Sequence, residues 1–393
     1  MEKPIRTKDD LHMMQQLPLD IKVRMSKSRI ADAVYKFGSD GLYISFSGGK
    51  DSTVLLDIVR EDWPDIPAVF SNTGLEYPEI QKFVRTKENV TIVTPKMQFP
   101  EVISTYGYPM ISKEVAEAIY YARRIKTTGE KNRVRRALNG ELNLHEGLKT
   151  QESKRREMLA EHMENNGEKS RYNKEKWKPA AQELPFMISH YCCNVMKKSP
   201  MGLYKRQTHR IPFIGTLAEE SRLREQAWLR HGCNSFEGAK QSSQPLSFWT
   251  EQDILQYIAK NNLPISSVYG DIVPSDSKGL EYSTGLGTCE SRLKCTGCER
   301  TGCVYCGFGF HLEKGETRFQ KLAKTHPKQY EYCLSGGQWV DNPAYDATAS
   351  KYDGDWKNWN PKKIWVPSKQ GLGMKFVFDE FNQLYGKNMM RYE

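Results

Sequence analysis

Apolar residues in the first hundred positions alternate between helical and extended spacing. Over residues 20–37 they recur at near-helical intervals, at Ile21, Val23, Ile30, Val34 and Phe37. Short apolar runs follow, each separated from the next by a segment of helical character. The pattern predicts helices over 20–37, 52–61 and 78–87 and strands over 42–46, 68–71 and 90–94.

The same pattern returns later, with a strand over 210–215, a helix opening at 219–224 and a helix over 250–259. Thr250 is placed to cap the last helix, with Asp253 at its third position. Strands that alternate with helices build a parallel sheet covered on both faces. The predicted fold class is therefore α/β, a doubly wound parallel sheet, and such sheets bind ligands at the carboxyl ends of their strands.

The turn after the first predicted strand carries the sequence SGGKDS over 47–52. Its glycines let backbone N–H groups approach an anion, and the next helix begins with its positive dipole end toward that anion. Lys50 adds a positive charge, and Asp51 is a candidate magnesium ligand, because a carboxylate beside phosphates needs a metal ion between them. The Walker spacing is absent. The alternative is an ordinary glycine turn with an exposed Lys–Asp pair.

Length and charge limit the class of protein. The 393 residues can form one large domain with insertions or two domains. No apolar run reaches the roughly 20 residues that span a bilayer, and the start has no signal segment, so we expect a cytoplasmic protein. The net charge of +10 is concentrated in 122–178, where 16 Lys or Arg face 9 Asp or Glu. That segment is either a basic face for nucleic acid or a solvated helical insertion without a ligand.

Nine cysteines in such a chain indicate metal or redox chemistry rather than disulfides. They include the adjacent pair Cys192-Cys193 and the series Cys295-x-x-Cys298-x4-Cys303-x-x-Cys306. The series alone has the spacing of a tetrahedral zinc site, but such a site would give Cys192 and Cys193 no role as ligands. Cys289, Cys295 and Cys298 are further candidates for a second metal or for sulfur-carrying thiols. We interpret Cys233 and Cys333 as buried small hydrophobes, and His311 and His326 as packing residues.

These features predict four regions. A nucleotide-binding α/β domain covers 1–112 and 186–270, a basic helical insertion covers 113–185, a Cys-rich cluster-binding region covers 271–335, and an aromatic tail covers 336–393. In the tail, Lys351, Lys357, Lys362 and Lys363 are interleaved with Trp339, Trp356, Trp359 and Trp365. This composition suits stacking on single-stranded bases, but an apolar apron packed against the main domain is the favoured interpretation.

The spaced motifs together resemble the phosphoadenosine phosphosulfate (PAPS) reductase-like family of the adenine nucleotide α-hydrolase superfamily. SGGKDS resembles the PP-loop of its N-type ATP pyrophosphatases. The likeness covers roughly 42–258 and the cysteine region. Its motifs are 47–52, Thr73-Gly74 with Tyr77-Pro78, Cys192-Cys193 with Lys197-Lys198 and Pro200, Gly215 with Glu220-Ser221 and Arg224, and Cys303-Val304-Tyr305-Cys306.

The resemblance implies roles for particular residues. Ser47, Gly48, Gly49, Lys50, Asp51 and Ser52 would hold the pyrophosphate, with Gly215 and Glu220 in the same nucleotide site. Thr73 and Gly74 would contact the nucleoside, and Lys198 and Arg224 would meet phosphate or sulfate. Cys192, Cys193, Cys303 and Cys306 resemble the ligands of the 4Fe-4S cluster in adenylylsulfate reductases and in the related enzyme of DNA phosphorothioation systems, which is the favoured interpretation.

Two departures separate the chain from true sulfonucleotide reductases. Those enzymes usually have a degraded loop, whereas the Gly-Gly-Lys-Asp set is intact here, which favours ATP with Mg2+. They also carry a nucleophilic cysteine in a C-terminal Glu-Cys-Gly segment, whereas the last cysteine here is Cys333. We therefore expect an ATP pyrophosphatase that adenylates an acceptor in sulfur transfer to DNA or tRNA, with a sulfur donor such as a cysteine desulfurase.

Two other functions stay open. The first is a reductase of PAPS or adenylylsulfate. The second is a nucleotide-binding accessory protein of a nucleic-acid-targeting defence complex.

Overall fold

The computed structural model describes residues 6–123, 173–238, 240–275, 292–345, 347 and 359–393, and the backbone of 164–165 and 168–169. Residues 124–163 of the basic insertion, Cys289 and Trp356 therefore lie outside the described residues, as do Lys351 and Lys357. The chain divides into two compact units, Met1–Pro95 with Lys197–Cys303 and Lys96–Met196 with Val304–Glu393. These units do not coincide with the four regions expected from the sequence, because the Cys-rich region is shared between them.

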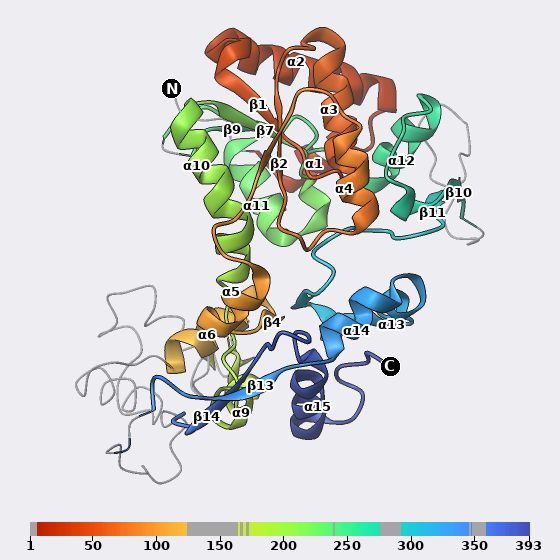
Figure 1. Cartoon of the computed structure of the whole chain (residues 1–393). Helices are drawn as coiled ribbons and strands as arrows, with labels where there is room; N and C mark the ends of the chain where they lie inside the picture. The colour runs from red at the N-terminus through yellow and green to blue at the C-terminus, as the bar shows by residue number, and fades with distance from the viewer. Residues whose placement is uncertain are drawn as a thin grey trace. The chain divides into compact units, whose positions relative to one another are not determined.

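A six-stranded sheet forms the centre of the first unit, in the order β3-β2-β1-β7-β9-β8 (Figure 1). All neighbouring pairs are parallel except β8 with β9. The strands are β1 (Leu42–Ser45), β2 (Ala68–Ser71), β3 (Val90–Val93), β7 (Ile211–Ile214), β8 (Asn234–Ser235) and β9 (Ser242–Ser243). The predicted class, α/β with a mostly parallel central sheet, is confirmed.

Helices of this unit follow the predicted alternation. They are α1 (Lys8–Gln15), α2 (Leu19–Phe37), α3 (Lys50–Asp62), α4 (Pro78–Arg85), α10 (Ser199–Thr208), α11 (Arg222–His231) and α12 (Glu251–Lys260). Thr250 caps α12 in a reciprocal box with Asp253, as predicted. Helices α2, α3 and α12 pack against one another, and α10 contacts β2 and β3. An antiparallel pair of strands, β10 (Ile272–Pro274) and β11 (Leu293–Cys295), completes the unit.

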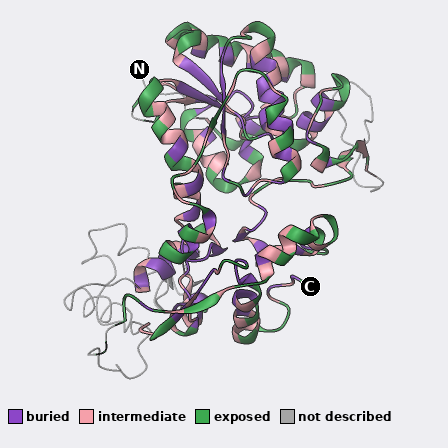
Figure 2. Ribbon diagram, viewed as in Figure 1, coloured by how far each residue is buried: buried purple, intermediate pink, exposed green. Residues whose placement is uncertain are grey.

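The core of the first unit lies around β1. Leu42, Tyr43 and Ile44 are all buried, so both faces of this strand are covered, as expected for a central parallel strand. Figure 2 shows buried residues concentrated in the central strands and in α3. Because both faces of β1 are covered, its first three residues form a continuous apolar run and do not alternate between apolar and polar residues.

The second unit is mainly helical. It contains α5 (Phe99–Tyr106), α6 (Lys113–Arg123), α9 (Lys178–Glu183), α13 (Arg318–Thr325), α14 (Pro327–Leu334) and α15 (Met374–Tyr385). Its strand pairs are β4 (Met110–Ile111) with β12 (Gly307–Phe308) and β13 (Gln338–Asp341) with β14 (Lys363–Val366). The short β5 (Glu164–Asn165) and β6 (Glu168–Lys169) also pair.

Aromatic side chains of the C-terminal tail pack inside this second unit. Trp365 lies 4.6 Å from Phe376 and 5.5 Å from Trp339, between ring centroids. Trp359 donates its indole N–H to the carbonyl of Leu184 at 2.8 Å. These contacts agree with a packing role for the three tryptophans, although Trp339 is 46% exposed. No helix in the described part of the chain is long and apolar enough to cross a membrane.

Candidate active site

The loops that follow four strands of the sheet meet at its carboxyl edge. The chain leaves β1 for β2 on one side, and β7 lies on the other side of β1. This reversal of strand order is a topological switch point, the usual ligand site of an open parallel sheet. Residues 47–49 follow β1 there, 72–77 follow β2, 215–221 follow β7 and 244–250 follow β9.

The loop at 47–49 is fixed by its own side chains. Ser52 Oγ accepts from the backbone N–H of Ser47 at 3.1 Å and donates to the carbonyl of Gly49 at 2.9 Å. Gly49 N–H donates weakly to Ser47 Oγ at 3.3 Å. Gly48 has φ +73°, and a Cβ there would lie 2.7 Å from Val84 Cγ2 and 2.8 Å from Ile80 Cγ2. Glycine is therefore required at position 48 for its backbone angle and for space.

Replacing Gly48 by alanine should destabilise the first unit more than replacing Gly74. Gly74 also has φ +73°, but nothing lies within 4 Å of its missing Cβ. Both substitutions carry the left-handed penalty of about 1–2 kcal/mol. Gly48→Ala adds overpacking of about 1–3 kcal/mol. Urea denaturation of both variants measures the difference, and equal losses of unfolding free energy would contradict the steric argument.

Lys50, the first residue of α3, is almost completely buried, at 4% exposed. Its ammonium donates to Glu251 Oε1 at 2.7 Å and to the carbonyl of Glu299 at 2.5 Å. Its backbone N–H donates to the hydroxyl of Tyr269 at 3.2 Å, and the Tyr269 ring centroid lies 5.7 Å from Nζ. Segments about 200 and 250 residues further along the chain thus fix this lysine.

A cavity of about 340 Å³ opens beside Lys50. It is lined by Lys50, Asp51, Leu217, Glu219, Glu220, Glu251 and Arg300. Burial raises the pKa of Asp51, and the positive charges of Lys50, Arg300 and Arg224 oppose that rise. Glu220 forms ion pairs with both Arg224 and Arg300. Burial, and then the charge of Arg300, lowers the pKa of Arg224. Positive and negative groups are therefore interleaved around the cavity, an arrangement that suits phosphates accompanied by a cation.

Four of the predicted site residues come together here. Lys50, Asp51 and Glu220 line the cavity. Arg224 does not line it but forms an ion pair with Glu220. A Cβ on Gly215 would lie 3.0 Å from the carbonyl of Asp51, so β7 and the start of α3 approach closely.

Three other predicted residues, Thr73, Gly74 and Lys198, do not line the cavity. Thr73 is tied into its own turn, since its N–H and hydroxyl both donate to Glu76, and Gly74 N–H donates to Asn72. Lys198 is exposed and does not line the cavity, whereas Lys197 lies 3.9 Å from Glu76.

Four residues that line the cavity, and Tyr269 beside Lys50, were not predicted as site residues; the four are Leu217, Glu219, Glu251 and Arg300. None of them belongs to a phosphate-binding motif. Glu251 had one indirect signal, because it follows the predicted cap Thr250 and must therefore lie at the start of a helix.

The cysteines fall into both units. In the second unit, burial raises the pKa of Cys306, a hydrogen bond from the Phe308 backbone and the charge of Arg318 oppose that rise, and Cys193 adds a smaller increase. In the first unit, burial raises the pKa of Cys295, and Lys50 and Cys298 are near enough to affect it. Cys233 and Cys333 are buried, as predicted. Within the described ranges, no group of three or more His, Cys, Asp or Glu is arranged to hold a metal ion.

A mostly parallel α/β sheet with a glycine–lysine loop at its switch point defines a doubly wound fold of the nucleotide-binding kind. A family model described as "Phosphoadenosine phosphosulfate reductase domain" matches residues 41–160 and 150–307 of the 393. The chain therefore belongs to the PAPS reductase domain family. This membership is consistent with nucleotide-binding sulfur-transfer chemistry and indicates an enzyme.

Other comparisons are less informative. One similar solved structure is the PAPS reductase from Candida auris in a phosphate complex, with 12% identity and a TM-score of 0.31. The match covers 68% of this chain and 92% of that one. No curated protein matches the sequence.

Proposed function

We propose that the protein is an ATP pyrophosphatase that cleaves ATP between its α- and β-phosphates and adenylates an acceptor, in sulfur transfer to a nucleic acid. The observation that carries the proposal is the intact 47–52 loop, whose Lys50 and Asp51 line one cavity with Arg300. A substrate with a β-phosphate uses this lysine, whereas a sulfonucleotide does not need it.

The chain's own residues account for the first step. Backbone N–H groups of the loop and the start of α3 bind the pyrophosphate portion. An acceptor oxygen attacks the α-phosphorus, pyrophosphate leaves, and Lys50 and Arg300 stabilise the charge on it. Asp51 fits one magnesium ligand, because Mg2+ is commonly bound by one or two carboxylates plus substrate phosphates. When bound, the ion neutralises phosphate charge.

The second step exchanges oxygen for sulfur. The terminal sulfur of the donor persulfide attacks the adenylated atom, and AMP leaves with the acceptor's original oxygen. A second thiol then attacks the remaining S–S bond at the donor's sulfur, so that the sulfur stays on the acceptor as a thiolate and the donor cysteine forms a disulfide with that thiol. The basic segment 122–178, most of which lies outside the described residues, supports a polyanionic acceptor, DNA or tRNA. The donor would be a persulfide such as a cysteine desulfurase forms.

A specific observation bears on the reductase alternative. The last cysteine, Cys333, has 0% of its surface exposed, and this burial raises the pKa of its thiol well above the ordinary value. A buried neutral thiol is a poor nucleophile. The family membership favours the reductase, but this thiol and the intact loop favour ATP.

The test is product analysis with ATP labelled at the α- or the γ-phosphate. AMP with pyrophosphate supports the proposal, and ADP with phosphate contradicts it. Sulfite release from PAPS with thioredoxin would support the reductase. Tight ATP binding without any cleavage would favour the accessory protein. Turnover that is unchanged by added DNA or RNA would count against a nucleic-acid acceptor.

We also propose a 4Fe-4S cluster held by Cys192, Cys193, Cys303 and Cys306. The proposal rests on the resemblance of the Cys192-Cys193 and Cys303-x-x-Cys306 motifs to thiolate ligands of such clusters, and the charge effect of Cys193 on Cys306 is consistent with it. When bound, the cluster would supply a redox centre or a source of sulfide.

Iron content separates this cluster from a zinc site. After anaerobic purification, we expect Cys193→Ser and Cys306→Ser each to lose most of the iron and sulfide, because each removes one thiolate ligand. Cys233→Ser, a buried cysteine that accepts from Ser247 in the first unit, is the control that keeps them. Zinc that depends on Cys295 and Cys298 but persists in Cys193→Ser would contradict the cluster.

A further inference from the structure

Glu251 is the anionic partner of the loop lysine. Its carboxylate accepts from Lys50 Nζ at 2.7 Å, and its own side chain is 48% exposed. Of the three ammonium protons of Lys50, two are used by Glu251 and by the carbonyl of Glu299. The direction of the third is thereby set, and that proton is the one available to a phosphate in the cavity.

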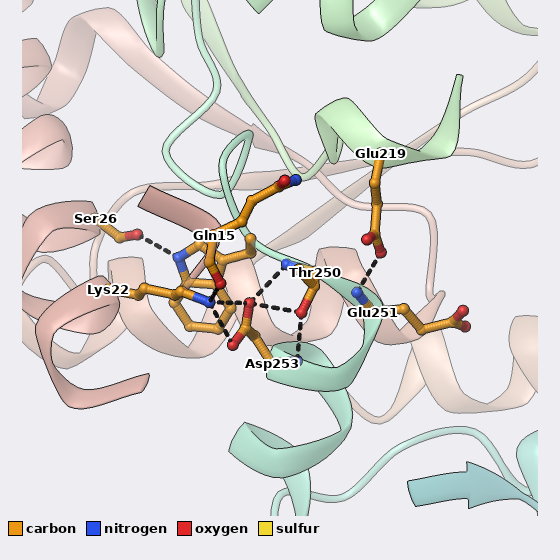
Figure 3. Close-up of polar contacts among 8 residues, drawn as sticks. Gln15, Lys22, Ser26, Glu219, Thr250, Glu251 and Asp253 are labelled. Atoms are coloured by element: carbon orange, nitrogen blue, oxygen red, sulfur yellow. Dashed lines mark hydrogen bonds and ion pairs between the residues drawn. The ribbon is translucent and has the colours of Figure 1, made fainter. Parts of the chain in front are cut away.

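Glu251 is held in turn by the first turn of α12 (Figure 3). Thr250 donates its N–H at 2.6 Å and its hydroxyl at 2.8 Å to Asp253 Oδ2. Asp253 N–H donates back to Thr250 Oγ1 at 3.2 Å. The backbone N–H of Glu251 donates to Glu219. These contacts fix the backbone from which the Glu251 side chain reaches Lys50.

A buried ion pair anchors this turn to α2. Lys22 Nζ donates to both carboxylate oxygens of Asp253, at 2.8 and 2.7 Å, and to the carbonyl of Gln15 at 2.6 Å. The two side chains are only 2% and 8% exposed. Figure 3 shows Lys22, Gln15 and Asp253 converging at the start of α12. A charge pair buried this deeply permits little movement, because separating the two side chains would leave each charge in the core without its opposite charge.

We propose that Glu251 positions the Lys50 ammonium for the departing pyrophosphate and that the Lys22–Asp253 pair sets the position of Glu251. Lys22 and Asp253 are therefore positioning residues that act through Glu251. The inference rests on the proposed function, because it assigns these residues to ATP cleavage. Loss of Glu251 misdirects Lys50 in the transition state, but it also removes a negative charge beside the phosphates. The expected signature is a lower kcat with nucleotide affinity unchanged or tighter.

The experiment compares kcat for AMP formation with the Kd for Mg2+ and α,β-methylene-ATP. We expect Glu251→Ala to lower kcat by about 10–100-fold, with Kd unchanged or lower. Glu251→Gln keeps an acceptor for Lys50 and should recover most of kcat. Glu61→Ala, at an exposed residue of α3 paired with Lys27, should change neither quantity.

The remote pair is tested by removing both of its charges, since Lys22→Met alone would leave Asp253 charged and unpaired in the core and would strongly destabilise the protein. Lys22→Met with Asp253→Asn should lower kcat about tenfold at unchanged Kd, and it should have no further effect on Glu251→Ala. Ser26→Ala is the matched control: Ser26 lies on the same face of α2 and contacts Pro245 and Trp249 instead. It should leave kcat unchanged.

The outcomes separate the two claims. A wild-type protein that binds no nucleotide would overturn the proposed function, and the inference with it. Nucleotide binding and AMP formation that Glu251→Ala leaves unchanged would overturn the inference alone. Equal losses of kcat in Ser26→Ala and in the double variant would also overturn it, because they would indicate general loosening between α2 and α12.

Discussion

Replacing Lys50 by methionine is expected to lower kcat for AMP formation by about 10²–10³-fold, the usual cost of removing one preorganised charge from a transition state. Methionine has a similar length and fills the same buried space, so the loss reports the ammonium group. Lys50 begins α3 at the end of the loop and lines the cavity, where charge develops on the leaving pyrophosphate. The measurement is a steady-state assay of AMP and pyrophosphate.

Lys260→Met is the control for this substitution. Lys260 is the last residue of α12, and its exposed side chain pairs with Asp20. An exposed pair of this kind contributes little to stability and nothing to the cavity. Activity should be unchanged. Lys50→Met with wild-type kcat would contradict the role of the loop in catalysis, and a change in affinity alone would favour the nucleotide-binding accessory protein.

The central strands could be predicted because their signal is local. Each of β1 and β2 begins with three consecutive apolar residues between turns, and both strands lie within the predicted ranges. The two-residue strands β8 and β9 could not be predicted in the same way. They owe their extended geometry to pairing with neighbours, Asn234 opposite Ser243 and Phe213 opposite Ser243, and not to an apolar pattern.

Helix α2 illustrates what periodicity does not determine. The apolar residues predicted the helix correctly, but Ile21 is exposed, whereas Lys22, Ser26, Ile30 and Ala33 are buried. The buried face includes two polar residues because Ser26 and Lys22 bond to the 245–253 segment, more than 200 residues away. An amphipathic pattern assumes that polar side chains face water, and it fails where they find partners in the core.

The same distinction holds for the site. Lys50 and Asp51 could be predicted because one loop contains them and has a characteristic composition. Glu251 and Tyr269 reach the loop only through tertiary packing, from α12 and from η5 (Ser267–Tyr269). A single sequence does not show which distant segments come into contact in the fold. The phosphate side of the site was therefore visible in the sequence, and the residues that hold its lysine were not.

Arg123 is expected to be the residue of the second unit whose loss is most damaging among those with a clear structural role. Arg123→Met should lower the free energy of unfolding by about 3–5 kcal/mol. The Arg123 guanidinium donates to the carbonyls of Ala180, Ala181, Leu184 and Phe186. It thereby satisfies the carbonyl groups at the end of α9, and a cation is favourable at that end of the helix dipole.

Trp359 adds a second contribution, because the Arg123 guanidinium lies 4.3 Å from its ring centroid and the indole N–H donates to Leu184. Methionine can replace the aliphatic stem of Arg123 but none of its donors, so four carbonyls would lose a partner at once. Arg123→Lys should recover only part of the stability, since an ammonium cannot reach all four. Arg29→Met, which removes an exposed pair with Asp32 at 3.5 Å, is the control and should cost less than about 0.5 kcal/mol. Urea denaturation with hydrogen exchange over α9 measures both, and wild-type protection of α9 in Arg123→Met would show that water replaces the guanidinium without loss.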